Sequence, residues 1–502
     1  MLSTIQHFTR CQAPRSTVNL IQYVAANLTW FCLLLSVTPA GAQVTNPVTY
    51  TLLADSALMD DCLICGRPTI FYQLRGTFTL VPLDSNPLFV RYRLTNISFR
   101  TEEGSGSRYE IRGDGDFKTG GEVAVVQEMT LELNLNDFAT TFSSDTQPVE
   151  RQFPLIAINL HQTQTNLLQF FTLRLVAAPM REVWFSTASG FTSAIKDFHG
   201  SGGDVLSSSG RIVKSYSNLV ANLNLLPNDS PPGIDAFDVG SAGEFFISFN
   251  VNQSNATPRL FRHGDLFSTA VNGGSYANQT LMQQFGVMPV VPDVGLDAAI
   301  VRGKGDILFS IRDDVFSERL SMMLRKGDLL SNAGQIVFRN SELLARFHPS
   351  TAKDYGLDAI YIWPHGEIWF SVEEGFQDLQ LGPIQAGDLL SSEGVVVFRN
   401  LEILSAFAPL EDLADFGLDG LFVVTDLVPP AGPPRITKVE RQRPSGTISL
   451  QWSGPGKVFQ VEKASLVTGP YAPISPYLPA LNFDDVDASS GGDQGFYRLR
   501  QW

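Results

Sequence analysis

Three short motifs recur through the middle of this chain with a common spacing of about 61 residues. The first, the serine motif, is a strand-like string that ends at Ser186, Ser248, Ser310 and Ser371. The second, the Gly-Asp motif, contains Asp204, Asp265, Asp328 and Asp388. The third, the Gly-Leu-Asp motif, has Ile in place of Leu in its first copy and contains Asp235, Asp297, Asp358 and Asp419. Three independent markers with one period predict four copies of a single structural unit.

Each copy predicts about four antiparallel strands and one short helix. In the last copy, residues 356–374 place two runs of β-branched and aromatic residues around a Pro-His-Gly turn, and residues 387–400 surround a Ser-Glu-Gly turn in the same way. Both patterns predict hairpins. Asn400 then precedes an amphipathic stretch, so we expect it to be a helix N-cap, and Asn340 has the same place one copy earlier.

Four such copies fit a small radial propeller, in which repeated four-stranded sheets leave only short exposed edges. They also fit a linear stack, in which each copy touches only its neighbours. The ends of the repeat region favour the propeller. Residues 171–186 predict a hairpin that lacks the Gly-Leu-Asp motif, and residues 417–426 predict a last strand without a partner. If this last strand completes the first sheet, the ring is closed.

The rest of the chain also predicts β-structure, so the expected fold class is all-β. Residues 43–170 alternate polar and apolar side chains and predict a separate β-sandwich-like domain. The four repeats then occupy residues 171–428. A stiff proline-rich linker follows at 429–435, and a terminal module occupies 436–502.

The terminal module resembles a fibronectin type III-like sandwich, because Trp452 lies on an early predicted strand and Tyr497 on a late one, facing a common core. At 67 residues the module is shorter than is usual for that family. Over the longer chain, DDCLICGRP, GGEVA and REVWFS, followed by GDLLS and GLDA repeats, are similar to a group of exported bacterial proteins that end in such a module, often at FYR. This resemblance implies architecture and export, and it carries no expectation about chemistry.

Residues 1–42 have the features of a secretory signal peptide. They contain Arg10 and Arg15, no acidic residue, an apolar run at 30–37, and small residues before a cleavage point after Ala42. The alternative is an uncleaved membrane anchor, although polar residues interrupt the run and leave it barely long enough to span a bilayer. We therefore expect a secreted or extracytoplasmic protein of the periplasm, the envelope or the extracellular medium.

The net charge argues against two classes of partner. The full chain carries −15 at pH 7, and loss of the two arginines with the signal peptide takes the exported part to −17. Such an acidic chain, with no cluster of Lys or Arg, is repelled by nucleic acid and by anionic lipid surfaces. After the signal peptide, no run of the sequence is long and apolar enough for membrane insertion. The expected partner is a protein or a glycan.

Cys62 and Cys65 are the only cysteines of the exported part, and their motif has three interpretations. A zinc site needs two further ligands, and the histidines of the chain are scattered without pairing. A redox centre needs a helix N-terminus, whereas here Asp60 and Asp61 precede the motif and disfavour a thiolate. The remaining interpretation is a disulfide across a small loop, which would stabilise the fold by about 2 kcal/mol.

No motif with a recognisable catalytic mechanism is present in the sequence. It contains no Gly-x-Ser-x-Gly, no His-Glu-x-x-His, no phosphate-binding loop and no dinucleotide-binding glycine motif. A pair of carboxylates for glycoside cleavage stays open, because their separation is not visible in a sequence. We expect no enzyme activity and no cofactor, with calcium as the open alternative.

The eight aspartates of the repeats have two interpretations. As turn devices, their carboxylates bind nearby backbone N–H groups and recur because the fold recurs. As a ring around an axis, one set would bind Ca²⁺ through oxygen ligands, since four crowded carboxylates otherwise repel one another. We favour turn devices for both sets.

A further acidic stretch, residues 112–122, is expected to be a polar hairpin loop. The spacing of Asp114, Asp116 and Glu122 is also suggestive of calcium, but it lacks the glycine and third acid of an EF-hand loop. The tripeptide that begins at Arg112 matches a short adhesion motif, which three residues specify only weakly.

The main functional hypothesis is a non-enzymatic exported binding or adhesion protein that presents its repeats to a protein or a glycan. One alternative is a polysaccharide-active hydrolase or lyase that uses carboxylates of the repeats. The other is a structural component of an envelope or matrix.

Intact mass spectrometry of the exported protein tests both covalent expectations. We expect a chain that begins at Gln43, with a mass lower by the two hydrogens lost in a disulfide, and with thiols that alkylate only after reduction. A chain that retains Met1, or cysteines that alkylate without reduction, would contradict them.

Overall fold

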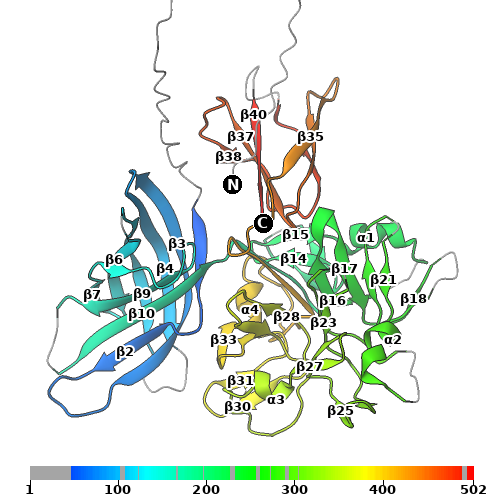
Figure 1. The fold of residues 1–502 in the computed structure, drawn as a ribbon, viewed down its shortest axis with the longest axis horizontal. Coiled ribbons are helices and arrows are strands. Elements are labelled where there is room, and N and C mark those ends of the chain that lie inside the picture. The colour runs from blue at the N-terminus through cyan, green and yellow to red at the C-terminus, as the bar shows by residue number, and fades with distance from the viewer. Residues whose placement is uncertain are drawn as a thin grey trace, which may run out of the picture.

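The computed structural model describes residues 47–502 apart from 102–107, 123, 165–167, 196, 227–231, 256–259, 272, 289–292, 304 and 489–494. The described residues form antiparallel sheets with short helical turns, so the predicted all-β class is confirmed. Figure 1 shows an N-terminal sheet in blue and cyan, a set of small sheets in green and yellow, and a terminal module in orange and red. The predicted signal peptide, residues 1–42, lies outside the described residues.

The N-terminal part is a single ten-stranded antiparallel sheet whose pairings return to their starting point. Its strands are β1 (Val48–Leu52), β2 (Ala57–Asp61), β3 (Ile70–Ser85), β4 (Phe89–Thr101), β5 (Glu110–Gly120), β6 (Val126–Leu135), β7 (Phe138–Ser143), β8 (Gln147–Pro148), β9 (Ile156–Gln162) and β10 (Phe170–Pro179). β10 pairs with β1, β2 and β9, and β9 also pairs with β7.

The inward side chains of this sheet form one apolar core. In β6, for example, Leu131, Leu133 and Leu135 are buried, whereas Glu132 and Asn134 are exposed. Successive residues of a strand point to opposite faces, so this alternation places one face on the core. The single sheet replaces the sandwich-like pair of sheets that the sequence predicted. β3 and β4 bend at β-bulges, which lets one sheet curl around its own core.

The first part of the chain also extends further than the sequence suggested. The predicted repeat hairpin at 171–186 does not form, because residues up to Pro179 belong to β10. Leu175 and Ala177 pack in the N-terminal core, while Val176 packs against the repeats on the other face of the strand. Residues 175–179 of β10 are buried on both faces and show no alternation, so this apolar run did not reveal which sheet the strand joins.

The repeat region forms four four-stranded antiparallel sheets. In sheet order the strands are β15 (Arg211–Lys214), β14 (Val205–Ser207), β11 (Glu182–Ser186) and β34 (Gly420–Val424); β16 (Ile234–Val239), β17 (Phe245–Phe249), β20 (Leu266–Ser268) and β21 (Ser275–Tyr276); β22 (Ala299–Val301), β23 (Ile307–Phe309), β26 (Leu329–Ser331) and β27 (Gln335–Phe338); and β28 (Ile360–Ile362), β29 (Ile368–Phe370), β32 (Leu389–Ser391) and β33 (Val395–Phe398). β34 pairs with β11, with Val424 opposite Glu182 and Gly420 opposite Ser186. The last strand therefore completes the first sheet, as the sequence predicts.

One strand from each sheet lies against its counterpart in the next sheet. β16 approaches β34 and β22, and β28 approaches β22 and β34, so the four strands follow one another around a common axis. We call β34, β16, β22 and β28 the axial strands. Each begins within two residues of the aspartate of a Gly-Leu-Asp motif, so the fold gathers these four aspartates around the axis.

Each repeat also contains a two-stranded hairpin that the sequence did not predict, because its strands are only two or three residues long. These hairpins are β12 (Phe191–Thr192) with β13 (His199–Gly200), β18 (Gln253–Ser254) with β19 (Leu260–Phe261), β24 (Val315–Ser317) with β25 (Met322–Leu324), and β30 (Phe376–Asp378) with β31 (Gly382–Ile384).

The described helices are single turns, and none has the length or apolar composition to cross a bilayer. They are α1 (Tyr216–Leu219), α2 (Asn278–Leu281), α3 (Asn340–Leu343), α4 (Asn400–Ile403), and the 3₁₀ turns η1 (Ala221–Leu223), η2 (Ser241–Gly243) and η3 (Gln283–Phe285). The N-cap prediction for Asn340 and Asn400 is wrong, because the preceding arginines are the N-caps. The buried Asn400 amide instead donates to the carbonyls of Gly387 and Gly417, which ties the Gly-Asp motif to the Gly-Leu-Asp motif.

The terminal module is built from two three-stranded sheets that share one core. Its strands are β35 (Arg435–Arg441), β36 (Ile448–Ser453) and β39 (Asn482–Asp485) in one sheet, and β38 (Ala472–Pro473), β37 (Phe459–Ala464) and β40 (Phe496–Gln501) in the other. Trp452 lies in the core, and Tyr497 packs against it while its hydroxyl donates to Asp485 at 2.7 Å.

A buried glutamate joins the N-terminal sheet to the fourth repeat. Glu367 accepts hydrogen bonds from the Ala54 backbone N–H at 3.0 Å and from the Ser391 hydroxyl at 2.7 Å, and it lies 3.9 Å from the Arg75 guanidinium. Burial would raise the pKa of Glu367, but the hydrogen bond from His365 and the charge of Arg75 lower it to about 2. This carboxylate is therefore charged and held by groups from both parts.

The equivalent glutamate of the first repeat lies beside the terminal module. Glu182 accepts from the Trp184 indole N–H at 2.8 Å and from Arg211 at 2.7 Å. The same Arg211 nitrogen donates to the Tyr477 carbonyl at 2.6 Å. The same position of the repeat, Glu182 in the first copy and Glu367 in the fourth, thus contacts the terminal module in one case and the N-terminal sheet in the other.

We expect Glu367→Gln to destabilise the protein by about 3–5 kcal/mol at pH 7, because it leaves Arg75 buried without its counter-charge. A lowered pKa in the folded state gives stability that is present above the unfolded pKa and is lost as the pH falls toward 2. The difference between variant and wild type should therefore shrink as the pH falls below about 4.3. Chemical denaturation at several pH values measures it.

The matched control is Glu402→Gln, since Glu402 pairs with Arg100 across the same interface but both side chains are about one third exposed. An exposed pair contributes about 0–1 kcal/mol. Equal losses for the two variants would contradict the role assigned to Glu367.

Candidate functional site

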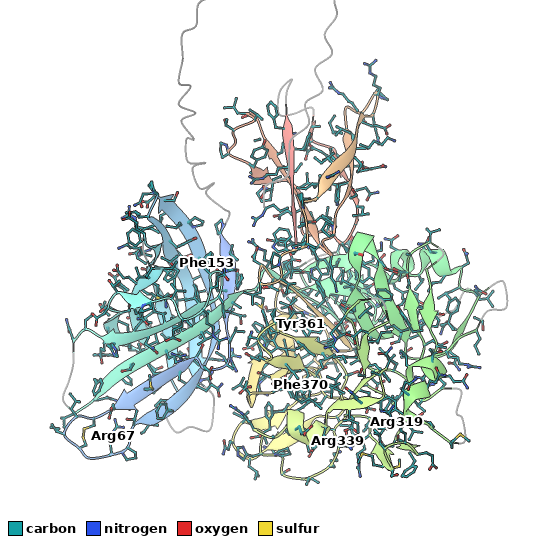
Figure 2. All side chains as sticks on the ribbon, viewed as in Figure 1. Arg67, Phe153, Arg319, Arg339, Tyr361 and Phe370 are labelled. Atoms are coloured by element: carbon teal, nitrogen blue, oxygen red, sulfur yellow. A yellow bond between two sulfur atoms is a disulfide. The ribbon has the colours of Figure 1, made fainter. Side chains whose placement is uncertain are left out.

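Cys62 and Cys65 form a disulfide at the end of the β2–β3 hairpin, with their Cα atoms 5.5 Å apart. The loop is fixed by Arg67, which donates to the Asp60 carbonyl at 3.0 Å, and by Gln169, which donates to the Asp60 carboxylate at 2.9 Å. Figure 2 shows Arg67 at the lower tip of the N-terminal sheet. The motif has the geometry of a turn held by a covalent bond.

Residues 112–122 do not form the expected hairpin loop, because most of them lie in β5, which pairs with β4 and β6. Asp116 forms an ion pair with Arg93 at 3.0 Å, and Asp114 bonds to the same arginine. The sequence did not predict this strand because it contains Gly113 and Gly115, and glycine is depleted in strands. Here a Cβ at Gly115 would clash with the Thr130 carbonyl, so the neighbouring backbone occupies that space.

The aspartates of the Gly-Asp motif have the contacts of turn devices. Asp388 accepts from the backbone N–H of Gln385 at 3.0 Å and of Asn400 at 2.9 Å. Asp204 makes the same two kinds of contact, with Ser201 at 2.9 Å and Tyr216 at 2.7 Å. The other members are Asp265, which accepts from the Asn278 N–H, and Asp328, which accepts from the Arg325 N–H. Each carboxylate ties its own turn to the backbone near the following helix.

The aspartates of the Gly-Leu-Asp motif differ. Asp235, Asp297 and Asp419 are nine-tenths or more buried, and each has one carboxylate oxygen without a hydrogen-bond partner among the described residues. Asp358 keeps some accessible surface. Turn-forming contacts therefore do not account for this set, which we call the axial ring.

The four carboxylates of the axial ring act on one another. Burial raises the pKa of Asp297 to about 8, with further contributions from the charges of Asp235 and Glu373. Burial also raises the pKa of Asp235 to about 7, although Arg312 opposes the shift. Burial and the charges of the other ring members raise the pKa values of Asp358 and Asp419 well above the usual range. The ring is an unusually unfavourable place for four negative charges.

The serine motif holds the ring in place. The Ser310 hydroxyl accepts from the Ala298 N–H of its own sheet at 2.8 Å and donates to the Leu357 carbonyl of the next sheet at 2.8 Å. Ser371 does the same one repeat later, donating to the Leu418 carbonyl at 2.7 Å. Each accepting carbonyl immediately precedes a ring aspartate, so these serines fix the position of one sheet's aspartate against the neighbouring sheet.

A second layer of residues lies two positions after each serine, and the sequence analysis missed it. These residues are Ala188, Asn250, Arg312 and Glu373. Arg312 lies 3.7 Å from the Asp235 carboxylate and donates to the Asn250 carbonyl at 2.9 Å. Glu373 pairs with Lys326 at 2.8 Å. The period identifies this layer, but its side chains differ in size and charge from one repeat to the next, so it has no motif.

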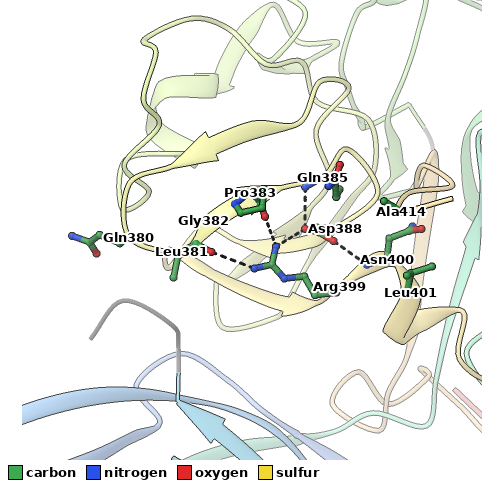
Figure 3. Close-up of a pocket in the computed structure, with 10 residues that line it drawn as sticks. All are labelled: Gln380, Leu381, Gly382, Pro383, Gln385, Asp388, Arg399, Asn400, Leu401 and Ala414. Atoms are coloured by element: carbon green, nitrogen blue, oxygen red, sulfur yellow. Dashed lines mark hydrogen bonds and ion pairs between the residues drawn. The ribbon is translucent and has the colours of Figure 1, made fainter. Parts of the chain in front are cut away.

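An open cavity of about 450 Å³ lies between β31 and α4, as Figure 3 shows. Its lining residues are Gln380, Leu381, Gly382, Pro383, Gln385, Asp388, Arg399, Asn400, Leu401 and Ala414. Arg399 crosses its floor, donating to the Asp388 carboxylate and to the Pro383 carbonyl, each at 2.8 Å. The ion pair between Arg399 and Asp388 therefore stabilises the fold.

Comparison with known proteins finds no family whose sequence model matches this chain and no curated protein with significant similarity. Among the described residues, no three His, Cys, Asp or Glu side chains are placed to hold a metal ion directly.

The axial ring predicts a pH dependence of stability. Because the pKa of Asp297 is raised to about 8, the folded state keeps its proton while the unfolded chain loses it above about pH 4. The wild type therefore loses stability as the pH rises from 5 to 8, and Asp297→Asn, which cannot ionise, should not share this loss. We expect the Tm of the variant to rise relative to wild type by about 3 °C or more over this range.

Thermal unfolding in a chelating buffer at several pH values measures the effect. The control is Asp306→Asn, whose carboxylate is half-exposed and pairs with Arg302. A Tm difference for Asp297→Asn that does not change with pH would contradict the raised pKa.

Proposed function

We propose that this chain is an exported, non-enzymatic binding protein whose repeats present a recognition surface to a macromolecular ligand. The observation that carries the proposal is the open cavity beside α4. Its charged pair serves the fold, which leaves Pro383, Gln385 and Leu401 to meet a ligand. Five of the ten lining residues are polar or charged and five are apolar or glycine, so the cavity offers a ligand both hydrogen bonds and apolar contact.

The lining favours a protein segment over a glycan. None of the ten lining residues is aromatic, so the site lacks the flat apolar faces on which sugars stack. Two leucines at or beside the cavity are exposed, Leu379 by 73% and Leu401 by 47%. Exposed leucines around a cavity suit an apolar side chain of a protein partner.

The architecture that supports this surface is, in our proposal, a four-bladed propeller between two β modules, the last of fibronectin type III type. Four sheets of equal strand number, the pairing of β34 with β11 and the ring of axial strands support the propeller. Two small sheets around Trp452 support the terminal module. The signal-like features of residues 1–42 and the net charge support export and a ligand other than nucleic acid or a membrane.

The polysaccharide-active alternative receives less support. A glycosidase needs two accessible carboxylates about 5–10 Å apart. Three members of the axial ring are too buried to reach a polymer, and Asp388 is bonded to the backbone on both of its oxygens. The other alternative, a structural envelope component, predicts that the protein self-associates, which sedimentation measures.

The binding proposal is tested by selection of a displayed random peptide library on immobilised residues 43–502. We expect enrichment of peptides with an apolar anchor residue, and a loss of affinity of about tenfold or more in Leu401→Asp, because a charge would enter the cavity. The matched control is Leu466→Asp, an equally conspicuous exposed leucine in the terminal module, at 61% exposure.

The same protein is incubated with a panel of cellulose, chitin, pectin and peptidoglycan, and release of reducing sugar is measured. Saturable turnover that disappears with one carboxylate variant would replace the proposal by the enzymatic alternative. If the selected peptides bind wild type and Leu401→Asp equally, the cavity is not the binding site.

A further inference from the structure

The cavity beside α4 has a counterpart in the third repeat, with the same arginine at its floor. Arg339 and Arg399 are the N-caps of α3 and α4, and Nη1 of each donates to the aspartate of its own Gly-Asp motif at 2.8 Å. Each Nη1 also donates to a carbonyl of the neighbouring hairpin, that of Met323 at 3.3 Å or that of Pro383 at 2.8 Å. The two sites therefore differ in the side chains around a shared guanidinium.

The main difference is a methionine in the third repeat and a glycine in the fourth. Met322 and Gly382 have the same place in the β24–β25 and β30–β31 hairpins, each opposite the third residue of the first strand. Nη2 of Arg339 donates to the Met322 thioether. Nη2 of Arg399 instead donates to the Leu381 carbonyl at 3.5 Å, which is long for a hydrogen bond. The fourth repeat thus keeps the donor but lacks the thioether that accepts from it.

Gly382 leaves room for the missing side chain. A Cβ on Gly382 would meet no atom of the described residues within 4 Å. Gly382 lines the open cavity of about 450 Å³, and Figure 3 shows it with Pro383 next to the Arg399 guanidinium. The cavity therefore presents this guanidinium together with space for a side chain from outside the repeat.

A methionine side chain has the chemistry that this space requires. It is unbranched and flexible, so it fits an irregular cavity, and its sulfur is a weak acceptor for a group that can only donate. Met322 shows that such a thioether lies against the equivalent guanidinium within the same protein. The exposed Leu401 on the cavity wall offers apolar contact for the rest of the side chain.

The part of the chain that builds the cavity is acidic, which indicates the charge of the partner. Residues 376–416 contain one basic residue, Arg399, and seven acidic ones: Asp378, Asp388, Glu393, Glu402, Glu411, Asp412 and Asp415. Three of the seven are paired with arginines. The other four have no Lys or Arg within ion-pair distance in the described part of the chain, and one of them, Asp412, is exposed two residues before Ala414 of the lining. Such a surface attracts a basic segment.

We infer that the cavity beside α4 binds a methionine side chain that projects from a basic segment of a partner protein. The thioether accepts from Nη2 of Arg399, the rest of the side chain packs against Leu401, and a Lys or Arg beside the methionine lies near Asp412. This inference rests on the binding function proposed above and names the residue that the cavity recognises.

Peptide selection identifies the anchor residue. A displayed library of random peptides is selected on immobilised residues 43–502, and the bound clones are screened again on Leu401→Asp. Among the clones that Leu401→Asp fails to bind, we expect a methionine with Lys or Arg beside it. In a synthetic copy of a leading clone, leucine in place of methionine should weaken binding about tenfold, and norleucine, which keeps the shape without the sulfur, should weaken it about threefold.

Gly382→Met gives the fourth repeat the side chain that the third repeat already has. We expect it to occupy the cavity and to weaken binding of the methionine peptide about tenfold or more. The matched control is Gly305→Met in the β22–β23 turn, because Gly382 and Gly305 have φ of 78° and 82° and open space at Cβ. Both variants therefore carry the same backbone strain and the same new side chain. The control should bind as wild type does, and the Tm of each variant shows that it folds.

The outcomes separate this inference from the function on which it rests. Clones that depend on Leu401 but carry leucine or aromatic anchors, or a leading peptide that binds equally well with leucine or binds Gly382→Met as it binds wild type, would show that the methionine assignment is wrong while the cavity still binds a protein. If no clone is enriched, or every clone binds Leu401→Asp as it binds wild type, the proposed function fails and this inference fails with it.

Discussion

The backbone pairing of β34 with β11 is the interaction on which the rest of the repeat region depends. It brings residues 420–424 back to the first sheet and gives that sheet its axial strand. Without β34, Asp419 would leave the axial ring, and β16 and β28 would each lose one neighbour. The pairing also carries Asp426 to the interface where it bonds Arg181 and the indole of Trp502. The same strand pairing thus completes the first sheet of the repeats and places Asp426 where it attaches the terminal module.

Much of the repeat architecture follows from the sequence, because its signals are local and are repeated four times. The turns around Gly366 and Gly394 set the two hairpins of the last repeat, and the observed strands flank them closely. The closing strand was also foreseeable, since residues 417–426 have strand character and no partner nearby in the sequence. Agreement among four copies separates a true strand signal from a chance resemblance.

Features without a local signal were not foreseeable. β5 contains glycines that argue against a strand, and only the close approach of the β6 backbone explains them. Residues 175–179 of β10 are buried on both faces, so their hydropathy could not assign the strand to one sheet. The short hairpins such as β30–β31 fall below the length at which alternation becomes visible. In each case the deciding contact comes from residues distant in the chain.

The two sets of aspartates show the same limit at the level of side chains. Both sets recur with one period and both lie directly after a glycine or one residue further on, so one interpretation served for both. The structure separates them, because Asp388 meets backbone N–H groups of its own turn, whereas Asp297 meets the charges of other repeats. Spacing predicts which residues are equivalent, but their environment depends on how the repeats are arranged around the axis.

The wide separation of β11 and β34 along the chain also makes strand exchange possible. Until residues 420–424 are available, the edge of β11 offers unpaired backbone groups, and an exposed edge is a template for a strand from any chain. The β34 strand of a second molecule carries the same residues and fits that edge equally well. At high concentration, two molecules that trade this strand would form an interlocked pair in which every sheet is complete and no single polypeptide is closed.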